Sequence, residues 1–420
     1  MKKYFTIKIF AAFIFILLFN GCVKDSCQNT YNYSYYIPVY KTSAEVRANI
    51  KSNPATEIKN PGKIFILGNY IFLNEINKGI HIIDNSNPSA PVNAAFIDIP
   101  GNVDIAVKGN ILFADLYTDL VALDISNPLN VIKTKIIDGV FPHRYYGSGF
   151  MADNTKIITD WIKRDTTVVH ECSSTGWTNT NRDFLFAMNA ADATKSAGSA
   201  TIGIAGSMAR FALMNNYLYT VSNTDLNAFN ISNTSNPAFA NKTAVGLNIE
   251  TIYPFKNNLF IGSANGMFIY NMQSSPANPV KVGEFAHARA CDPVIADDNY
   301  AYVTLRTGTA CRGSNNQMDI IRLNNLTNAA LAKTYQFTNP HGLSKDGILL
   351  FICDGTQGLK LYDASDVMNL KLIKQISGME TYDVIAYNNI AFVVAKDGLY
   401  QYDYSDLNNI RLLSKMGITK

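Results

Sequence analysis

Charge is scarce in this chain of 420 residues, and the charge that is present nearly cancels. Lys and Arg total 36 and Asp and Glu total 33, which gives a net charge of +3 and a charged fraction of 16%. No basic run occurs, so the sequence argues against a nucleic-acid partner. Hydrophobic residues make up 47% of the chain, which is enough to build a large globular core.

Motifs for catalysis and for metal binding are also missing from the sequence. It contains neither Gly-x-Ser-x-Gly nor His-Glu-x-x-His, which excludes the two hydrolase signatures that those motifs carry. The chain has only five His residues, and no spacing among them requires a metal site. The sequence therefore predicts no cofactor and no metal, and it assigns no catalytic residue.

One pattern is abundant: an apolar strand that ends in Asp or Asn, followed by a short turn rich in Ser, Asn and Pro. The residues that begin these turns in the eight copies are Asp84, Asp124, Asn189, Asn230, Asn271, Arg322, Asp363 and Asp403. Most steps between them are close to 40 residues, as in 124 − 84 = 40. A period of about 40 with several short strands per copy is typical of a β-propeller blade.

Each copy can be divided into four short strands, and its first hairpin turns at a pair such as Gly109-Asn110. We therefore predict an all-β fold, a β-propeller with four antiparallel strands per blade. Eight blades are favoured, and seven blades with one degenerate unit outside the ring are the alternative, because an insertion at residues 163–182 stretches the third unit. Quinone-dependent propeller dehydrogenases use regularly spaced Trp, whereas this chain has only Trp161 and Trp177.

The repeat resembles a known one. The segments GIHIIDNSNPSAP and LVALDISNP, with the hairpin at Gly109-Asn110, are similar to the LVIVD repeat. Two further segments, ETIYPFKNNLFIGSANGMFIYN and CDPVIADDNYAYVTLR, resemble lipoproteins of Bacteroidetes that carry it. This resemblance implies a propeller outside the cytoplasm, and it brings no established reaction or ligand.

The N-terminus predicts export and lipid attachment. Residues 5–19 are almost wholly apolar, follow a short basic start and end at Gly21-Cys22, which resembles a bacterial lipobox. We expect a signal peptide at 1–21, a lipid on Cys22 and a polar tether at 22–36. A flap with a short helix is expected at 37–62, where Thr42 and Glu45 fit a capping box, and the propeller at 63–420. The expected location is the outer membrane, with the propeller exposed at the cell surface or facing the periplasm.

A polar binding mouth is predicted at one face of the ring. Counting six residues back from the Asn of each first hairpin, or its equivalent, gives the start of each innermost strand. These positions are Lys63, Asp104, Ser148, Arg210, Ile252, Pro293, His341 and Asp383. Convergent polar groups at such a face favour a binding site, although mutually compensating surface charges are the alternative. The candidate binding residues are Asp104, His143, Arg144, Arg210, Glu250, Arg289, Asp292, Arg306, His341 and Asp383.

A disulfide bond is predicted near this mouth. Cys291 precedes the inner strand of one blade, and Cys311 follows the neighbouring antiparallel strand, so both reach the same face. An exported chain permits the bond. The pairing of Cys27, Cys172 and Cys353 is left open.

The sequence favours a cell-envelope lipoprotein that acts as a non-catalytic binding or scaffold propeller. Its expected partners are the membrane, through the lipid, and an envelope protein or a glycan. The alternative is an extracellular hydrolase or lyase that acts on a sugar or lactone at the mouth of the central channel.

Overall fold

A computed structural model describes residues 28–142, 155–171, 204–205, 207–208, 210–287, 293–307 and 315–418. The chain divides into two compact units. The larger unit contains residues 38–160 and 189–420, and the smaller contains residues 1–37 and 161–188.

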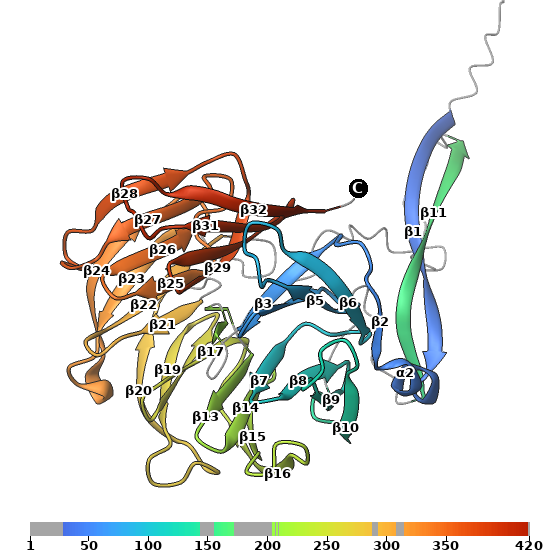
Figure 1. The fold of residues 1–420 in the computed structure, drawn as a ribbon, viewed down its shortest axis with the longest axis horizontal. Helices are drawn as coiled ribbons and strands as arrows, with labels where there is room; N and C mark the ends of the chain where they lie inside the picture. The colour runs from blue at the N-terminus through green and yellow to red at the C-terminus, as the bar shows by residue number, and fades with distance from the viewer. Residues whose placement is uncertain are drawn as a thin grey trace, which may run out of the picture. The chain divides into compact units, whose positions relative to one another are not determined.

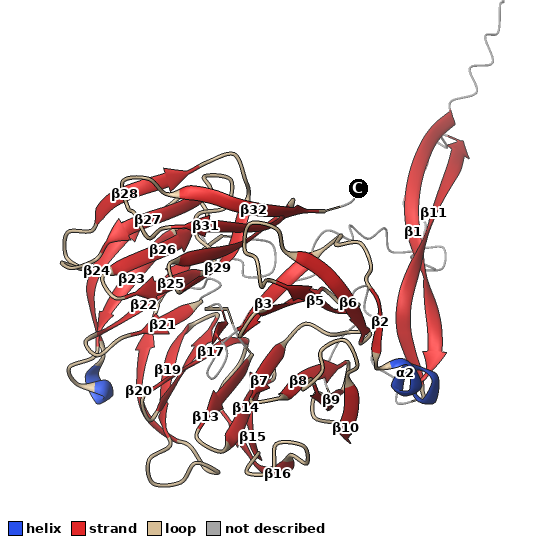
Figure 2. Cartoon of the chain, in the orientation of Figure 1, coloured by secondary structure: helices blue, strands red, loops and turns tan. Residues whose placement is uncertain are grey.

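Seven antiparallel sheets are arranged around a central axis in the larger unit, and strands account for most of it (Figures 1 and 2). The innermost strands of blades one to seven are β3 (Pro61–Leu67), β7 (Ile105–Lys108), β13 (Phe211–Met214), β17 (Ile249–Phe255), β21 (Val294–Ala296), β25 (Leu343–Asp346) and β29 (Thr381–Tyr387). The second strands are β4 (Tyr70–Glu75), β8 (Ile111–Leu116), β14 (Tyr217–Val221), β18 (Asn258–Ser263), β22 (Tyr300–Leu305), β26 (Leu349–Cys353) and β30 (Ile390–Ala395).

The third strands are β5 (Gly79–Asp84), β9 (Asp119–Asp124), β15 (Asp225–Asn230), β19 (Gly266–Asn271), β23 (Gln317–Arg322), β27 (Leu359–Asp363) and β31 (Gly398–Asp403). The outer strands are β6 (Val92–Asp98), β10 (Ile132–Ile137), β16 (Ala238–Ala244), β20 (Val280–Ala286), β24 (Ala330–Gln336), β28 (Lys371–Ile376) and β32 (Arg411–Gly417). Second and third strands are mostly buried, whereas outer strands consist mainly of exposed and half-buried residues, except for buried Ala95, Phe96 and Ile97 in β6. The exposure of side chains thus increases toward the outer strand, because each sheet is packed between two neighbouring sheets.

The turn-initiating Asp and Asn residues perform the same task in successive blades. Asp84 Oδ1 accepts the Ser86 backbone N–H at 2.9 Å, and Asp403 Oδ1 accepts that of Ser405 at 2.9 Å. The same bond forms at Asp124, Asn230, Asn271 and Asp363. A side chain that bonds to the backbone two residues later fixes the turn, which explains why the repeat requires Asp or Asn there. Blade five has Arg322 at this position, and Asn325 caps a short 3-10 helix, η2 (Leu326–Asn328), instead.

The prediction of a β-propeller is confirmed, but eight blades is wrong and the seven-bladed alternative is right. Blades two and three pack directly against each other, with Ala106 and Phe113 of one blade in the same core as Phe211 and Phe229 of the other. Part of the predicted third unit forms a different strand, β11 (Lys156–Glu171), which pairs with β1 (Gln28–Thr42). The repeat copy at 183–192 lies outside the described residues.

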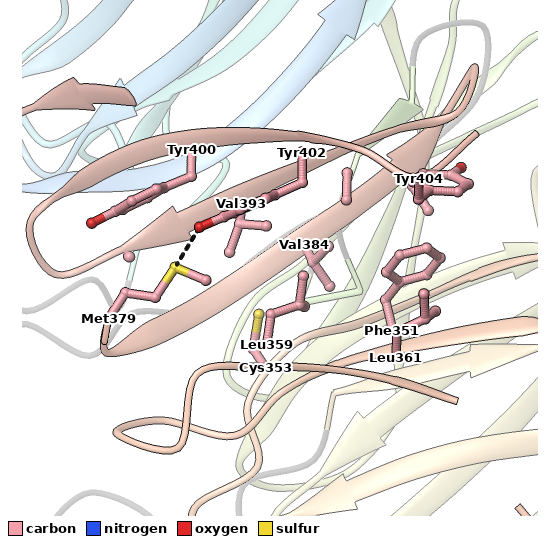
Figure 3. Packing of buried hydrophobic residues seen from close by; sticks show 13 residues of the cluster. Phe351, Cys353, Leu359, Leu361, Met379, Val384, Val393, Tyr400, Tyr402 and Tyr404 are labelled. Carbon is pink, nitrogen blue, oxygen red and sulfur yellow. Dashed lines mark hydrogen bonds between the residues drawn. The ribbon is translucent and has the colours of Figure 1, made fainter. Parts of the chain in front are cut away.

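Apolar clusters join neighbouring blades. Figure 3 shows the cluster between blades six and seven, where Phe351, Cys353 and Leu359 face Val384 and Val393. Blade seven meets blade one through Ile385 and Phe392 against Ile64 and Ile71, which closes the ring. At this seam Gln401 Nε2 also donates to Asn85 Oδ1 at 2.7 Å. Blades one and seven share no strand, so side-chain packing and such bonds close the ring.

The segment before the first blade contacts both blade one and blade two at their outer edges. Helix α2 (Ser43–Asn49) has the predicted capping box, because Thr42 N donates to Glu45 Oε2 at 2.7 Å and Glu45 N donates to Thr42 Oγ1 at 3.2 Å. Its Arg47 bonds to Asp119 at 2.5 Å. Strand β2 (Ser52–Pro54) then adds to β6 of blade one.

Candidate binding site at the channel mouth

The register of the sheets identifies seven equivalent positions at the start of the innermost strands. Thr251 pairs with Gly262 and Asp383 with Val394, each four residues before the end of the first hairpin strand. We call these positions the mouth residues: Lys63, Asp104, Arg210, Thr251, Pro293, Gly342 and Asp383.

Counting along the sequence therefore found five of the seven mouth residues and missed two by one residue. Ile252 is fully buried in the core between blades three and four, and Thr251 takes the mouth position. In blade six the predicted His341 lies one residue before Gly342, which takes the mouth position. Ser148, the remaining predicted position, lies outside the described residues, as do His143, Arg144, Arg289 and Asp292.

Lys63 and Asp104 form a buried ion pair between blades one and two. Their side chains are 5% and 1% exposed. Asp104 Oδ2 also accepts the backbone N–H of Arg210 at 2.8 Å, which ties blade three to the pair. Burial lowers the pKa of Lys63 and raises the pKa of Asp104, and each charge opposes the effect on its partner. The pair thus joins three blades at a cost in desolvation.

The loop that presents Asp104 is fixed by a second carboxylate. Asp115 Oδ1, at the end of β8, accepts from Asn102 Nδ2 and Val103 N at 2.8 Å and from Asp104 N at 2.9 Å. Asn102 Oδ1 in turn accepts from Asn74 Nδ2 of blade one at 2.7 Å. This buried network sets the backbone of Asp104 before its side chain meets Lys63.

Asp383 of blade seven is a second deeply buried carboxylate of the mouth. The residue is 3% exposed, its Oδ1 accepts Val384 N at 3.0 Å, and its Oδ2 is buried with no hydrogen-bond partner among the described residues. Burial raises the pKa of Asp383 to about 7, against the hydrogen bond from Val384 and the charge of Lys63. A Cβ on Gly342 would lie 2.1 Å from Asp383 Oδ1, so the carboxylate occupies the space that a side chain at position 342 would need.

On blades three to five the charged groups are half-buried. Burial raises the pKa of Glu250 to about 7, although the positive charges of Arg306 and Arg210 and the ring of His287 act to lower it. Burial also lowers the pKa of Arg306, and Glu250 opposes that shift. The Nε atom of Arg306 is buried and has no hydrogen-bond partner among the described residues.

His341 contributes to packing rather than to an open site. Its backbone N–H donates to Cys353 O at 2.7 Å, and its carbonyl accepts from Thr304 Oγ1 at 2.7 Å. The ring lies edge-on to Tyr382 with centroids 5.4 Å apart, and Nε2 is 3.1 Å from Asn339 Nδ2. The residue thereby connects blades five, six and seven.

One component of the mouth carries no signal in the repeat. Strand β12 (Ile204–Ala205) pairs with β3 on its channel side, antiparallel to it. Beyond it, Ser207 Oγ accepts the backbone N–H of Leu343 at 2.8 Å, and a backbone hydrogen bond from Ser207 acts to lower the pKa of Asp383. This segment crosses from blade one to blades six and seven before it reaches Arg210.

Several other predicted features lie outside the described residues, namely the lipid site at Cys22 and the disulfide between Cys291 and Cys311. Cys353, whose pairing was left open, is a buried free thiol. Within the described ranges, no three His, Cys, Asp or Glu residues are grouped as a metal site would need. Nor does any helix of that part have the length and apolar content to cross a membrane.

Comparisons with known proteins match this architecture. The model of the LVIVD repeat matches residues 61–96, 101–136 and 205–244, which correspond to blades one, two and three. No curated protein matches the chain by sequence.

Solved structures resemble it in fold. The periplasmic gluconolactonase PpgL of Pseudomonas aeruginosa is 10% identical, with a TM-score of 0.54 over 85% of this chain and 96% of that chain. The computationally designed Ika8 protein is 9% identical, with a TM-score of 0.52 over 87% and 91%. A protein from Lactobacillus plantarum is 12% identical, with a TM-score of 0.51 over 86% and 97%. The chain is thus a seven-bladed β-propeller that contains LVIVD repeats.

Proposed function

We propose that this protein is a cell-envelope lipoprotein whose propeller binds a glycan, or a similarly polar group of an envelope protein, at the mouth. Its N-terminal apolar segment and Cys22 support export and lipid attachment, as does the resemblance to Bacteroidetes lipoproteins. The LVIVD repeats support the propeller and bring with them no known reaction.

The observation that carries the binding proposal is the half-buried Glu250–Arg306 pair of charges. Arg306 offers a guanidinium with a buried Nε that has no partner among the described residues, and Glu250 is a carboxyl whose pKa is raised to about 7. Together they present a donor and an acceptor, which suits the alternating hydroxyl groups of a sugar. The buried pair Lys63–Asp104 joins blades one, two and three at the same mouth.

Titration of glycans selected on an array tests this proposal. We expect Arg306→Gln or Glu250→Gln to weaken binding about tenfold or more, because hydrogen bonds to charged groups contribute about 1.5–3 kcal/mol. Arg411→Gln is the matched control, because Arg411 pairs with Asp403 at the opposite end of its blade. Equal affinities for all four proteins would contradict binding at the mouth.

A second candidate function is hydrolysis of a sugar or lactone. The raised pKa values of Glu250 and Asp383, both about 7, are in the range that suits a general acid or base. Glu250 is the better candidate, because Asp383 is only 3% exposed. A gluconolactonase with the same fold makes lactones the first substrates to assay. Turnover that is lost in Glu250→Gln but kept in Arg411→Gln would favour this function over binding alone.

A further inference from the structure

The outer half of the β1–β11 sheet has two chemically different faces. Ser34 Oγ donates to Asp165 Oδ1 at 2.5 Å, and Thr167 Oγ1 donates to Asn32 Oδ1 at 2.8 Å. These contacts make the strands antiparallel and place all four polar side chains on one face, here called the polar face. Successive residues of a strand point to opposite sides. The opposite face, here called the tyrosine face, therefore consists of Tyr31, Tyr33, Tyr35, Arg164, Thr166 and Val168.

Half of the tyrosine face is exposed, because Tyr35, Thr166 and Val168 are half-buried. Tyr31 and Tyr33 are 46% and 40% exposed, and their rings stack with centroids 6.1 Å apart. Ile37 and Ile162, which continue this face in their strands, are 42% and 45% exposed. A two-stranded sheet is marginally stable alone in water, so apolar contacts on this face would stabilise it.

We propose that the tyrosine face lies in the phospholipid headgroup layer of a membrane. This inference rests on the proposed lipid on Cys22. Tyr31 is the ninth residue after Cys22, so the face can lie no more than about 30 Å along the chain from the lipid. The lipid thus holds the β1–β11 sheet beside a membrane surface.

The side chains of the face suit that surface. Tyr places an apolar ring and a polar hydroxyl across a membrane–water boundary, which is why it is enriched there. Arg164, a charged member of the face, is a cation whose guanidinium matches lipid phosphate. The polar face carries Asp165, whose carboxylate favours water. The tyrosine face is thus the more apolar of the two, although Val169, which continues the polar face, is also 51% exposed.

A pair of single-tryptophan proteins tests the orientation. In the full lipidated chain with Trp161→Phe and Trp177→Phe, one variant carries Tyr33→Trp and the other Asn32→Trp. Both are bound to vesicles of phosphatidylcholine and phosphatidylglycerol whose acyl chains are brominated next to the headgroup. We expect the bromines to quench Tyr33→Trp about twofold more strongly than Asn32→Trp, because adjacent strand residues point to opposite sides. Tyr31→Trp repeats the measurement if Tyr33→Trp does not fold.

The outcomes separate this inference from the lipid proposal. Equal quenching of the two variants would overturn it, as would flotation with the vesicles without quenching of either. In both cases attachment through Cys22 would still stand. If the lipidated chain does not float with vesicles at all, the lipid anchor itself is wrong, and the inference fails with it.

Discussion

Two halves of the same mouth contain similar residues in different surroundings. Blades one, two and seven supply Lys63, Asp104 and Asp383, and the side chains of the Lys63–Asp104 pair are 5% and 1% exposed. Blades three to five supply Arg210, Glu250 and Arg306, which are half-buried. The charged groups of one ring can therefore have two different roles. The buried charged groups join neighbouring blades, and the half-buried charged groups can contact a ligand.

Removing Asp104 should give the largest effect. Asp104→Ala leaves the buried Lys63 charge without its partner and the Arg210 N–H without its acceptor, so we expect a loss of about 3–5 kcal/mol in the free energy of unfolding. Urea denaturation measures it. The control Lys415→Ala breaks an ion pair with Asp397 whose side chains are 39% and 41% exposed, and it should cost about 1 kcal/mol or less. Similar losses in the two variants would remove the distinction between buried and exposed charges.

Asp383 should make stability depend on pH. Its pKa of about 7 is raised from the ordinary value of 3.8, so the folded protein holds this proton more tightly than the unfolded chain. The resulting stabilisation is complete below about pH 4 and is lost as the pH rises to about 7, by roughly a few kcal/mol at most.

The variant Asp383→Asn should flatten this part of the pH profile and be more stable than the wild type at pH 8. Thermal melts between pH 4 and 8 measure the difference. Glu250→Gln should flatten the profile in the same direction but less, because Glu250 is half-buried. A profile for Asp383→Asn that is parallel to that of the wild type would show that the carboxyl ionises freely.

Gly342→Ala tests the contact that confines Asp383. The new Cβ would lie 2.1 Å from Asp383 Oδ1, and we expect a loss of about 1–3 kcal/mol. Gly246→Ala is the control, because its Cβ would meet only the Phe268 ring at 3.3 Å. Adding Asp383→Ala should recover part of the loss. If Gly342→Ala is as stable as Gly246→Ala, the confinement of the carboxylate is overestimated.

The smallest change in stability is expected for Arg306→Gln. Its side chain is half-buried and its Nε has no partner among the described residues. The substitution should therefore change the free energy of unfolding by about 1 kcal/mol or less. The same variant should lose ligand binding, and calorimetry on one sample can compare the two quantities. A loss of several kcal/mol in stability would assign Arg306 to the structural half of the mouth.

The repeat predicted the blades because it encodes a local contact. Asp84 and Asp403 bond to the backbone two residues later, so their role can be read without knowing the fold. The number of blades depends on which strands pair across long distances. Residues 156–171 have a strand pattern, and nothing local to them shows that their partner is β1 rather than a blade.

The positions of most mouth residues could also be predicted from the sequence, because they too depend on a local feature of each repeat. Lys63, Asp104, Arg210 and Asp383 follow from a fixed distance to their hairpins. The one-residue difference at Thr251 arises because the turn of this hairpin is Lys256-Asn257, so Asn258 is already the first residue of the second strand. Ser207 reaches the mouth through a strand that pairs with β3. Its contacts come from blades six and seven, more than a hundred residues later, which no sequence pattern nearby could indicate.

The seam between blades seven and one has a consequence for biogenesis. The four main strands of every blade are consecutive in the chain, and among the described strands none from the N-terminal part joins the last blade. Synthesis produces blade one first and blade seven last, so Ile64 and Ile71 lack their partners Ile385 and Phe392 until blade seven has been made. Before that point the growing chain is an open arc of blades with an uncovered apolar side on blade one, and a chaperone would have most to protect there.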